Sequence, residues 1–231
     1  MGERQWWGVT DPNRLLIFTR PRLSQRKQRL LSCALCRDLE GGSGGRLFWD
    51  IIRLAERWAD GDHDPEAVAQ AEATFWQLFD ERHHTSTHDR ISHCMHAMSC
   101  LSELDPLHLF VQPVPSGWGR LREIGRDVGD WWRLGVSYRK RQPLPQSWCG
   151  VIRDICGNPF CPVSADPGWL TSDVVALATG IYEERAFDRM PILADALQDA
   201  GCDNDDILNH CRQADEHVRG CWVVDLVMGK K

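Results

Sequence analysis

The chain has 231 residues, 42% of them hydrophobic and 26% charged, with a net charge of −6 at pH 7. This composition is typical of a globular protein and excludes a disordered chain, and the acidic balance argues against nucleic acid as the main partner. No apolar run approaches the roughly 18 to 20 residues that span a bilayer, and residues 1–7 lack the pattern of a secretory signal, so we expect a cytoplasmic protein that does not contact a membrane.

Helical signals fill the N-terminal part of the chain. Thr10-Asp11-Pro12 offers an N-cap and a proline tolerated in the first turn, and it predicts a helix that begins there. A second helix follows Ser24, and glycines within 41–45 separate it from a third. The third helix carries apolar residues at the i, i+3, i+4, i+7 spacing of one buried face: Phe48, Ile51, Ile52, Ala55 and Trp58. Asp64-Pro65-Glu66 starts a fourth helix.

The middle of the chain is less regular. Residues 89–104 and 121–138 are predicted to be helical, with a proline- and glycine-rich loop between them. The one strand candidate, Leu107 to Val114, is interrupted by prolines and is therefore rejected. Pro143 and Pro145 mark the expected linker.

Five helices are predicted after the linker. They cover Trp148 to Cys156, the segment after Thr171 or Ser172, the segment from Pro191 to Gly201, the segment after Asp203 or Asn204, and Val218 to Met228. The last one is apolar on nearly every side, which places it inside the domain. The sequence thus predicts an all-α bundle or array. It has an N-terminal helical region, 1–142, and a C-terminal five-helix module, 146–231, packed as one globular unit.

Ten cysteines leave open a disulfide framework, the device of small secreted scaffolds. A chain of this length can bury a core without disulfides, and many of its cysteines lie inside helical patterns, so we expect free thiols. Cys33 and Cys36 form a Cys-x-x-Cys pair. They lie deep within the predicted helix rather than at the helix N-terminus that lowers a thiol pKa, so the pair does not favour a redox site.

A first metal candidate is a cluster of histidines and one cysteine between residues 83 and 100. On a helix, His93, His96 and Cys100 share a face and could ligate zinc. No Cys-x-x-Cys pair lies near them in sequence, and the alternative is a histidine-rich solvated loop that leads into an exposed helix stripe. The cluster consists of His83, His84, His88, His93, His96 and Cys100.

A second metal candidate lies near the C-terminus. Thiolate and imidazole ligands suit zinc, and four of them converging would make a structural site. The spacings match no known zinc finger, and the adjacent His210 and Cys211 diverge by about 100° on a helix. In the alternative interpretation the cysteines belong to the core and the histidines cap helices. The candidates are Cys202, His210, Cys211, His217 and Cys221.

Asp225 interrupts the apolar run of the last helix. A buried carboxylate requires a partner, and His210, Arg212, His217 and Arg219 are the nearby bases. A structural ion pair is the favoured interpretation. The alternative is a nucleophilic Cys-His-Asp site built from Cys211 or Cys221 with His217 and Asp225.

Eleven tryptophans make the chain rich in aromatic side chains. Adjacent pairs such as Trp6-Trp7 cannot both face one core, so one member of each pair is available for an interface, where aromatic anchors and arginine are common. The arginine- and tryptophan-rich stretch 120–141 could stack on nucleic acid, but Glu123, Asp127 and Asp130 argue against this.

Several motifs resemble a large paralogous family of helical proteins in planctomycete bacteria, typified by Gemmata-like genomes. They are Ala186-Phe187-Asp188-Arg189-Met190-Pro191, His210-Cys211-Arg212 and the run from His217 to Asp225, and Thr10-Asp11-Pro12 and the helix through Cys36-Arg37 fit too. The resemblance covers about 85 C-terminal and about 60 N-terminal residues, whereas residues 80–145 depart from the alanine-rich segment of that family. It implies a helical module made in many copies and carries no activity.

From these observations we expect a non-enzymatic interaction or regulatory module that binds another protein and has no cofactor. The alternative is a zinc-stabilised or Cys/His-dependent enzyme with its site between residues 202 and 225.

Overall fold

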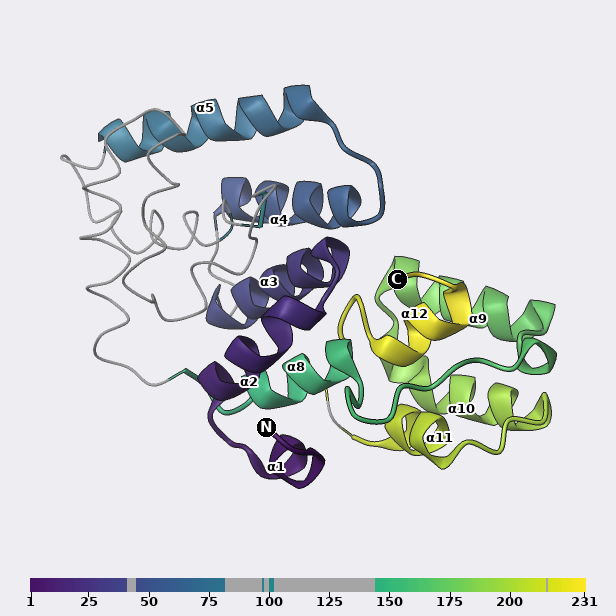
Figure 1. Ribbon diagram of the computed structural model, residues 1–231. Helices are drawn as coiled ribbons and strands as arrows, with labels where there is room; N and C mark the ends of the chain where they lie inside the picture. Colours follow the sequence, from purple (N-terminus) through teal and green to yellow (C-terminus); the bar gives the residue numbers. More distant parts are fainter. Residues whose placement is uncertain (41–44, 82–96, 98–99, 102–143, 215) are drawn as a thin grey trace. The chain divides into compact units, whose positions relative to one another are not determined.

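The computed structural model describes residues 1–40, 45–81, 97, 100–101, 144–214 and 216–231 (Figure 1). Across these residues the chain folds into α-helices and short 3-10 helices, without a strand, as the sequence predicted. None of the described helices is long and apolar enough to cross a membrane. The helices belong to two units, one of Asp11–Pro145 and one of Met1–Thr10 with Gln146–Lys231.

The first unit contains α2 (Pro12–Thr19), α3 (Gln25–Glu40), α4 (Arg46–Ala59) and α5 (Pro65–Glu81). The Asp11 side chain caps α2 by accepting a hydrogen bond from the Asn13 amide at 3.0 Å. Helix α4 contacts both α3 and α5. Of the stripe predicted on α4, Phe48, Ile51, Ile52 and Ala55 are buried, and Trp58 is half-buried with the Arg29 guanidinium over its ring.

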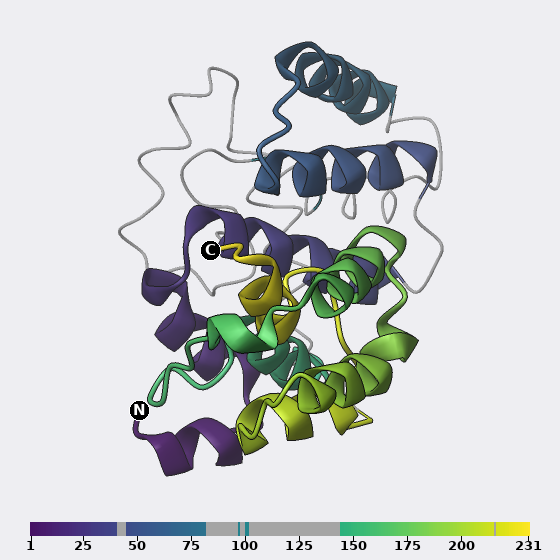
Figure 2. The same cartoon turned by 90° about the vertical axis from the view of Figure 1, so that its right-hand side faces the viewer.

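The second unit contains α8 (Trp148–Cys156), α9 (Ser172–Glu184), α10 (Met190–Asp199), α11 (Asp205–Arg212) and α12 (Trp222–Met228). Helix α10 contacts α9 and α11, and α12 contacts α8, α9 and α11 (Figures 1 and 2). Their core is apolar, with Ile181, Leu193, Ile207 and Val224 at 2% exposure or less. The described residues after 146 therefore form the five α-helices that the sequence predicted.

Two of these helices begin at the capping residues that the sequence indicated. The Thr171 hydroxyl accepts the Val174 amide at 3.3 Å, and the Asn204 side chain accepts the Ile207 amide at 3.1 Å. Helix α12 instead begins at Trp222 rather than at Val218, because Gly220 has a φ of 97°, which a helix cannot accommodate.

Residues 1–10 belong with the C-terminal unit, whereas the sequence-based division placed them in the N-terminal region. This segment forms α1 (Glu3–Gly8), a helix too short to persist alone. The Arg153 guanidinium of α8 donates to the carbonyl oxygens of Trp6 at 2.8 Å and Val9 at 2.6 Å, which satisfies the C-terminal end of α1. Trp6 is fully buried and Trp7 is 54% exposed, as expected for adjacent positions.

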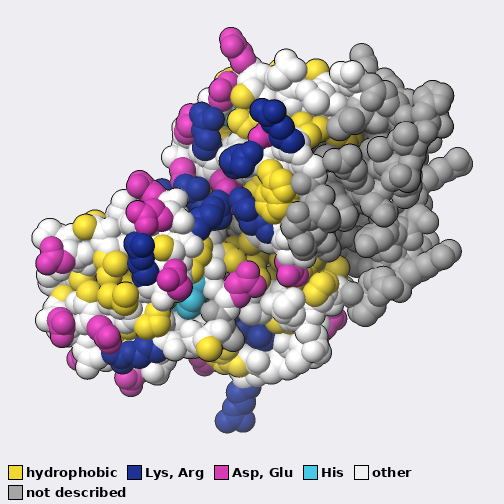
Figure 3. Space-filling view, turned by 180° about the vertical axis from the view of Figure 1, so that it is seen from behind, with side chains coloured by type: hydrophobic (Ala, Val, Ile, Leu, Met, Phe, Trp, Pro, Cys, Tyr) yellow, Lys and Arg dark blue, Asp and Glu magenta, His cyan; other side chains and the backbone are white. Residues whose placement is uncertain are grey.

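Charged side chains of both signs are mixed on the face of the molecule seen in Figure 3, where acidic side chains interrupt the basic ones. The predicted histidine cluster, except for Cys100, lies outside the described residues. So do the arginine- and tryptophan-rich stretch 120–141 and most of the predicted helices 89–104 and 121–138.

Candidate metal centre

Helix α8 positions a carboxylate at the edge of its buried face. Trp148, Val151, Ile152 and Ile155 of this helix are buried, and Asp154 is 3% exposed beside them. One carboxylate oxygen, Oδ2, accepts the backbone N–H of Val218 at 2.9 Å. The other, Oδ1, faces two imidazole rings, so the carboxylate is held in a fixed orientation.

The two imidazoles and a thiol come from α11, the loop after it and the start of α12. His210 lies in the last turn of α11, His217 in the following loop, and Cys221 at the N-cap of α12. The turn at Gly220 and the hydrogen bond from the Cys221 amide to the Val218 carbonyl, 2.9 Å long, reverse the chain between His217 and α12. Three side chains close in sequence are thereby brought to one point.

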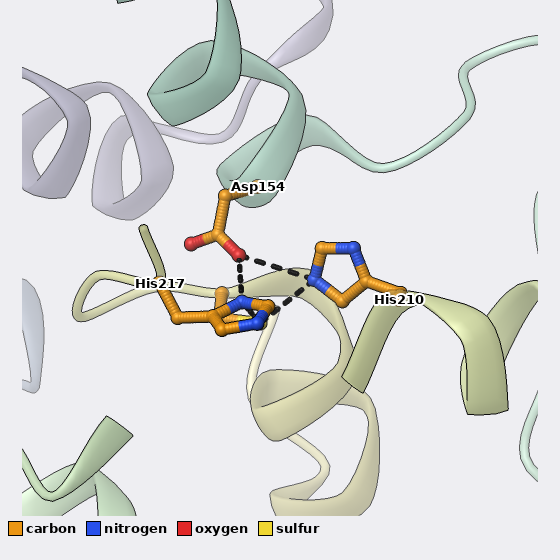
Figure 4. Close-up of side chains that lie close together, drawn as sticks. Asp154, His210 and His217 are labelled. Carbon is orange, nitrogen blue, oxygen red and sulfur yellow. Dashed lines mark hydrogen bonds and ion pairs between the residues drawn. The ribbon is translucent and has the colours of Figure 1, made fainter. Parts of the chain in front are cut away.

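Four donor atoms converge at this point, and Figure 4 shows the Asp154, His210 and His217 side chains among them. Asp154 Oδ1 lies 3.1 Å from His210 Nε2 and 2.7 Å from His217 Nδ1. Cys221 Sγ lies 3.2 Å from His210 Nε2 and 3.9 Å from His217 Nδ1. All four atoms are within 4.8 Å of one another, so they lie close enough to share one metal ion.

These separations agree with the coordination sphere of a zinc ion. Bonds of about 2.0 to 2.3 Å in tetrahedral geometry place neighbouring ligand atoms about 3.3 to 3.8 Å apart. Four of the contacts between donor atoms in the cluster run from 2.7 to 3.9 Å.

The side chains of the cluster are largely buried. The side chains of Asp154, His217 and His210 are 4%, 5% and 10% exposed, and Cys221 is fully buried. The two imidazole rings meet edge to face, and the Trp222 ring lies 5.1 Å from that of His210. A metal ion bound by these atoms would lie in a largely buried position.

Burial and hydrogen bonding set the charge of the group. Burial raises the pKa of the Asp154 carboxyl, but the hydrogen bonds and charges of His210 and His217 outweigh it and leave this pKa below its usual value. Burial, and then the Asp154 carboxylate, raise the pKa of the Cys221 thiol well above its usual value. At neutral pH the metal-free cluster therefore contains a carboxylate and a neutral thiol.

The second nitrogen of each imidazole has a different environment. The Gln213 amide nitrogen lies 2.9 Å from His210 Nδ1. An amide nitrogen donates, so in this arrangement Nδ1 accepts and the ring proton lies on His210 Nε2, which faces Asp154. Metal binding at Nε2 would move that proton to Nδ1, where the Gln213 carboxamide oxygen, once turned towards the ring, can accept it. His217 Nε2 is buried, and no hydrogen-bond partner for it lies among the described residues. Such a group costs about 1 to 3 kcal/mol, which a metal bond at His217 Nδ1 would offset.

Of the five metal ligands proposed from the sequence, the group contains His210, His217 and Cys221. It does not contain Cys202 or Cys211, which are buried in the apolar core of the unit. Burial, together with the Asp154 carboxylate and Cys202, raises the pKa of the Cys211 thiol to about 12. Both cysteines therefore act as small apolar side chains.

The carboxylate that contacts the histidines is Asp154 rather than Asp225. Asp225 is 1% exposed within α12 and is not part of the cluster. Arg212, a predicted partner of Asp225, is paired with Asp195 at 2.9 Å. Sequence reasoning missed Asp154. The signal that singled out Asp225, an acidic residue within an apolar helical run, is also present at Asp154 in the segment 148–156.

We compared the chain with protein-family models, curated protein sequences and solved structures, and none of them matched it.

Proposed function

We propose that the C-terminal unit is a zinc-stabilised, non-enzymatic helical module. Asp154, His210, His217 and Cys221 bind Zn²⁺ through Oδ1, Nε2, Nδ1 and Sγ. The proposal rests on the convergence of these four donor atoms within 4.8 Å in a buried setting. A mixed set of imidazole, thiolate and carboxylate suits zinc, whereas calcium and magnesium select sites made of oxygen atoms.

A structural role fits this arrangement better than a catalytic one. Catalytic zinc sites use three protein ligands and keep the fourth position for water or substrate, whereas structural sites are closed by four protein ligands. Four protein donors are present here, and none of their side chains is more than 10% exposed. The ion would join α8, α11 and α12, and its binding energy would contribute directly to the folding of the unit.

The geometry also argues against a cysteine nucleophile. In a catalytic triad the nucleophile and the carboxylate contact opposite nitrogens of one imidazole, so that a proton passes between them. Here His210 Nε2 contacts both the Asp154 carboxylate and the Cys221 thiol, and His217 Nδ1 likewise faces both groups. Both rings present one nitrogen to a common centre, which is the arrangement of a chelate.

A zinc ion bound by four protein ligands would fix α8, α11 and α12 relative to one another, and with them the surface that these helices form. A fixed surface of this kind is consistent with a module that binds another protein. We propose this interaction role, with a protein as the partner, because the site leaves no position for a substrate. The resemblance to a family made in many copies is in line with it.

The metal content of two variants tests the proposal. The full chain is purified without added metal, dialysed, and analysed for zinc by mass spectrometry. We expect Cys221→Ser to lose one equivalent of zinc relative to the wild type, because the serine hydroxyl is a poor zinc ligand. Cys211→Ser, which alters a buried cysteine outside the cluster, is expected to keep the wild-type content. Equal zinc content in Cys221→Ser and the wild type would overturn the proposal.

A further inference from the structure

One exposed face of the Asp11–Pro145 unit is basic and has an apolar centre. Arg14, Ile17 and Phe18 lie on one side of α2, because residues three and four apart in a helix share a face. Ile17 is 58% exposed and Arg14 is exposed beside it, while Phe18 is half-buried. A 3-10 helix follows α2 directly and adds the exposed Pro21 and Arg22. These five residues form the basic face.

Two sets of contacts hold the basic face in place. The Arg22 guanidinium lies 3.9 Å from the centre of the Phe18 ring and donates to the Phe18 carbonyl oxygen, which keeps its charge beside the apolar centre. The Gln28 side chain of α3 donates to the carbonyl oxygens of Arg20 and Leu23, both at 3.1 Å, and joins the 3-10 helix to α3. A surface that is already ordered loses less entropy when a partner binds.

The charge of this region differs from that of the rest of the chain. Seven basic residues and no acidic one lie from Pro12 to Arg37, although the whole chain has a net charge of −6. Arg26 and Arg37 are paired with Asp60 and Glu56, which lie outside the basic face. A partner that matches the basic face therefore carries carboxylates around an apolar side chain.

The C-terminal unit presents an exposed face with this complementary pattern. Ile192 is 57% exposed, and the exposed Asp195 and Asp199 lie on the same side of α10, three and seven residues further along. Asp203, in the turn after α10, is exposed too. Residues 190–207 contain five acidic residues and no basic one. Ile192 and the three aspartates form the acidic face.

We propose that the basic face of one chain binds the acidic face of a second copy of the same chain. Ile17 and Ile192 pack against each other at the centre, and the arginines of one face lie opposite the aspartates of the other. This inference rests on the proposed interaction role and names its partner. The two faces differ, so the contact either repeats along an open chain of molecules or occurs twice in a closed dimer.

A second copy fits the basic face better than a nucleic acid or a membrane does. A phosphate backbone supplies negative charge but leaves Ile17 without an apolar contact, whereas the acidic face supplies both. A helix that lies on a membrane buries a whole stripe of apolar side chains. Ile17 is the only large hydrophobic side chain that is exposed among the described residues of the Asp11–Pro145 unit.

Analytical ultracentrifugation of the full chain tests the inference. At low salt the average mass of the wild type should rise above the 26.4 kDa of one chain as the protein concentration increases. It should return to that value in about 0.5 M NaCl, where charges are screened over a few ångströms. The substitutions Arg14→Glu with Arg22→Glu should abolish the rise, and so should Asp199→Lys with Asp203→Lys.

A matched control carries the same change of charge elsewhere on the Asp11–Pro145 unit. Arg46 and Arg53 are exposed residues of α4 that pair with Asp50, and exposed pairs of this kind contribute little to stability. The chain with Arg46→Glu and Arg53→Glu should therefore associate as the wild type does. A loss of association in this control equal to that of Arg14→Glu with Arg22→Glu would contradict a specific basic face.

A mixture of the two interface variants gives the sharpest result. The chain with Arg14→Glu and Arg22→Glu keeps its acidic face, and the chain with Asp199→Lys and Asp203→Lys keeps its basic face. Each should be monomeric alone, whereas an equimolar mixture should form a 1:1 complex, which also shows that both variants fold.

Two results would overturn the inference: a mixture that does not associate, and a wild-type chain that is monomeric at every concentration in low salt. If that monomer instead binds a labelled oligonucleotide or anionic phospholipid vesicles, the basic face belongs to a polyanion. None of these substitutions alters a proposed zinc ligand. The zinc content of the same samples therefore decides the metal site separately from self-association.

Discussion

Replacement of Asp154 by asparagine is the most informative single change in the C-terminal unit. Asparagine has the shape of aspartate, but it lacks the negative charge that interacts with the two imidazoles and would bind the zinc ion. The carboxylate contacts His210, His217 and the Val218 amide at distances of 2.7 to 3.1 Å. The substitution therefore removes one metal ligand and weakens the hydrogen bonds that orient two others.

The expected magnitude follows from mass action. Free zinc at 100 to 1,000 times its Kd stabilises the folded state by about 2.7 to 4.1 kcal/mol, which is about a 100- to 1,000-fold change in the population of the unfolded form. In Asp154→Asn this zinc-dependent part disappears. The weakened hydrogen bonds of the buried group cost about a further 1.5 to 3 kcal/mol, which is present with or without zinc.

Hydrogen exchange followed by mass spectrometry measures this loss of zinc-dependent stability in individual peptides of the unit. Amides in peptides from α9, α10 and α12 that exchange through unfolding of the unit should exchange about 100 to 1,000 times faster in the wild type after chelation. The same peptides in Asp154→Asn should show no response to chelation. Asp195→Asn is the matched control, because its carboxylate is exposed and pairs with an exposed arginine; its zinc response should match the wild type. A normal zinc response in Asp154→Asn would refute the assignment.

Three further results are expected. Gln213→Ala should weaken zinc binding about 10- to 100-fold without changing the stoichiometry, because the Gln213 carboxamide adjoins His210 Nδ1 and its oxygen would accept the Nδ1 proton of the metal-bound imidazole. A titration against a chelating dye measures this, and an unchanged Kd would contradict it. The same titration should show that zinc affinity falls about tenfold for each pH unit lowered between pH 8 and 7. The raised pKa of Cys221 keeps this thiol protonated until zinc displaces its proton, so a pH-independent affinity would count against Cys221 as a ligand. Gly157→Ala should lower the free energy of unfolding by about 1 to 3 kcal/mol, because φ and ψ of 64° and −155° suit only glycine and the added Cβ would lie 3.1 Å from the Trp222 ring. Gly150→Ala, in α8 with open space around it, should instead raise this free energy by up to about 1 kcal/mol. Equal effects of the two substitutions in urea unfolding would refute the reasoning.

The helical content could be predicted because it depends on local signals. Caps at Asp11, Thr171 and Asn204 and the apolar stripe of α4 involve residues within a turn or two of one another. The late start of α12 was missed, because the positive φ of Gly220 results from the chain reversal before that helix.

The candidate site could be predicted only in part, for a physical reason. His210, His217 and Cys221 are close in sequence, so a common site was conceivable from their residue types. Asp154 lies 56 residues before His210, and only the packing of α8 in the unit brings it to the cluster. Contacts of this kind depend on tertiary packing, which periodicity does not specify.

Anomalous diffraction from a crystal of the zinc-loaded chain tests the central claim most directly. Data collected on both sides of the zinc absorption edge should give a peak within about 2.0 to 2.3 Å of Asp154 Oδ1, His210 Nε2, His217 Nδ1 and Cys221 Sγ. A zinc-saturated crystal without a peak at this position, in which the four side chains contact one another directly, would contradict a metal centre in the C-terminal unit.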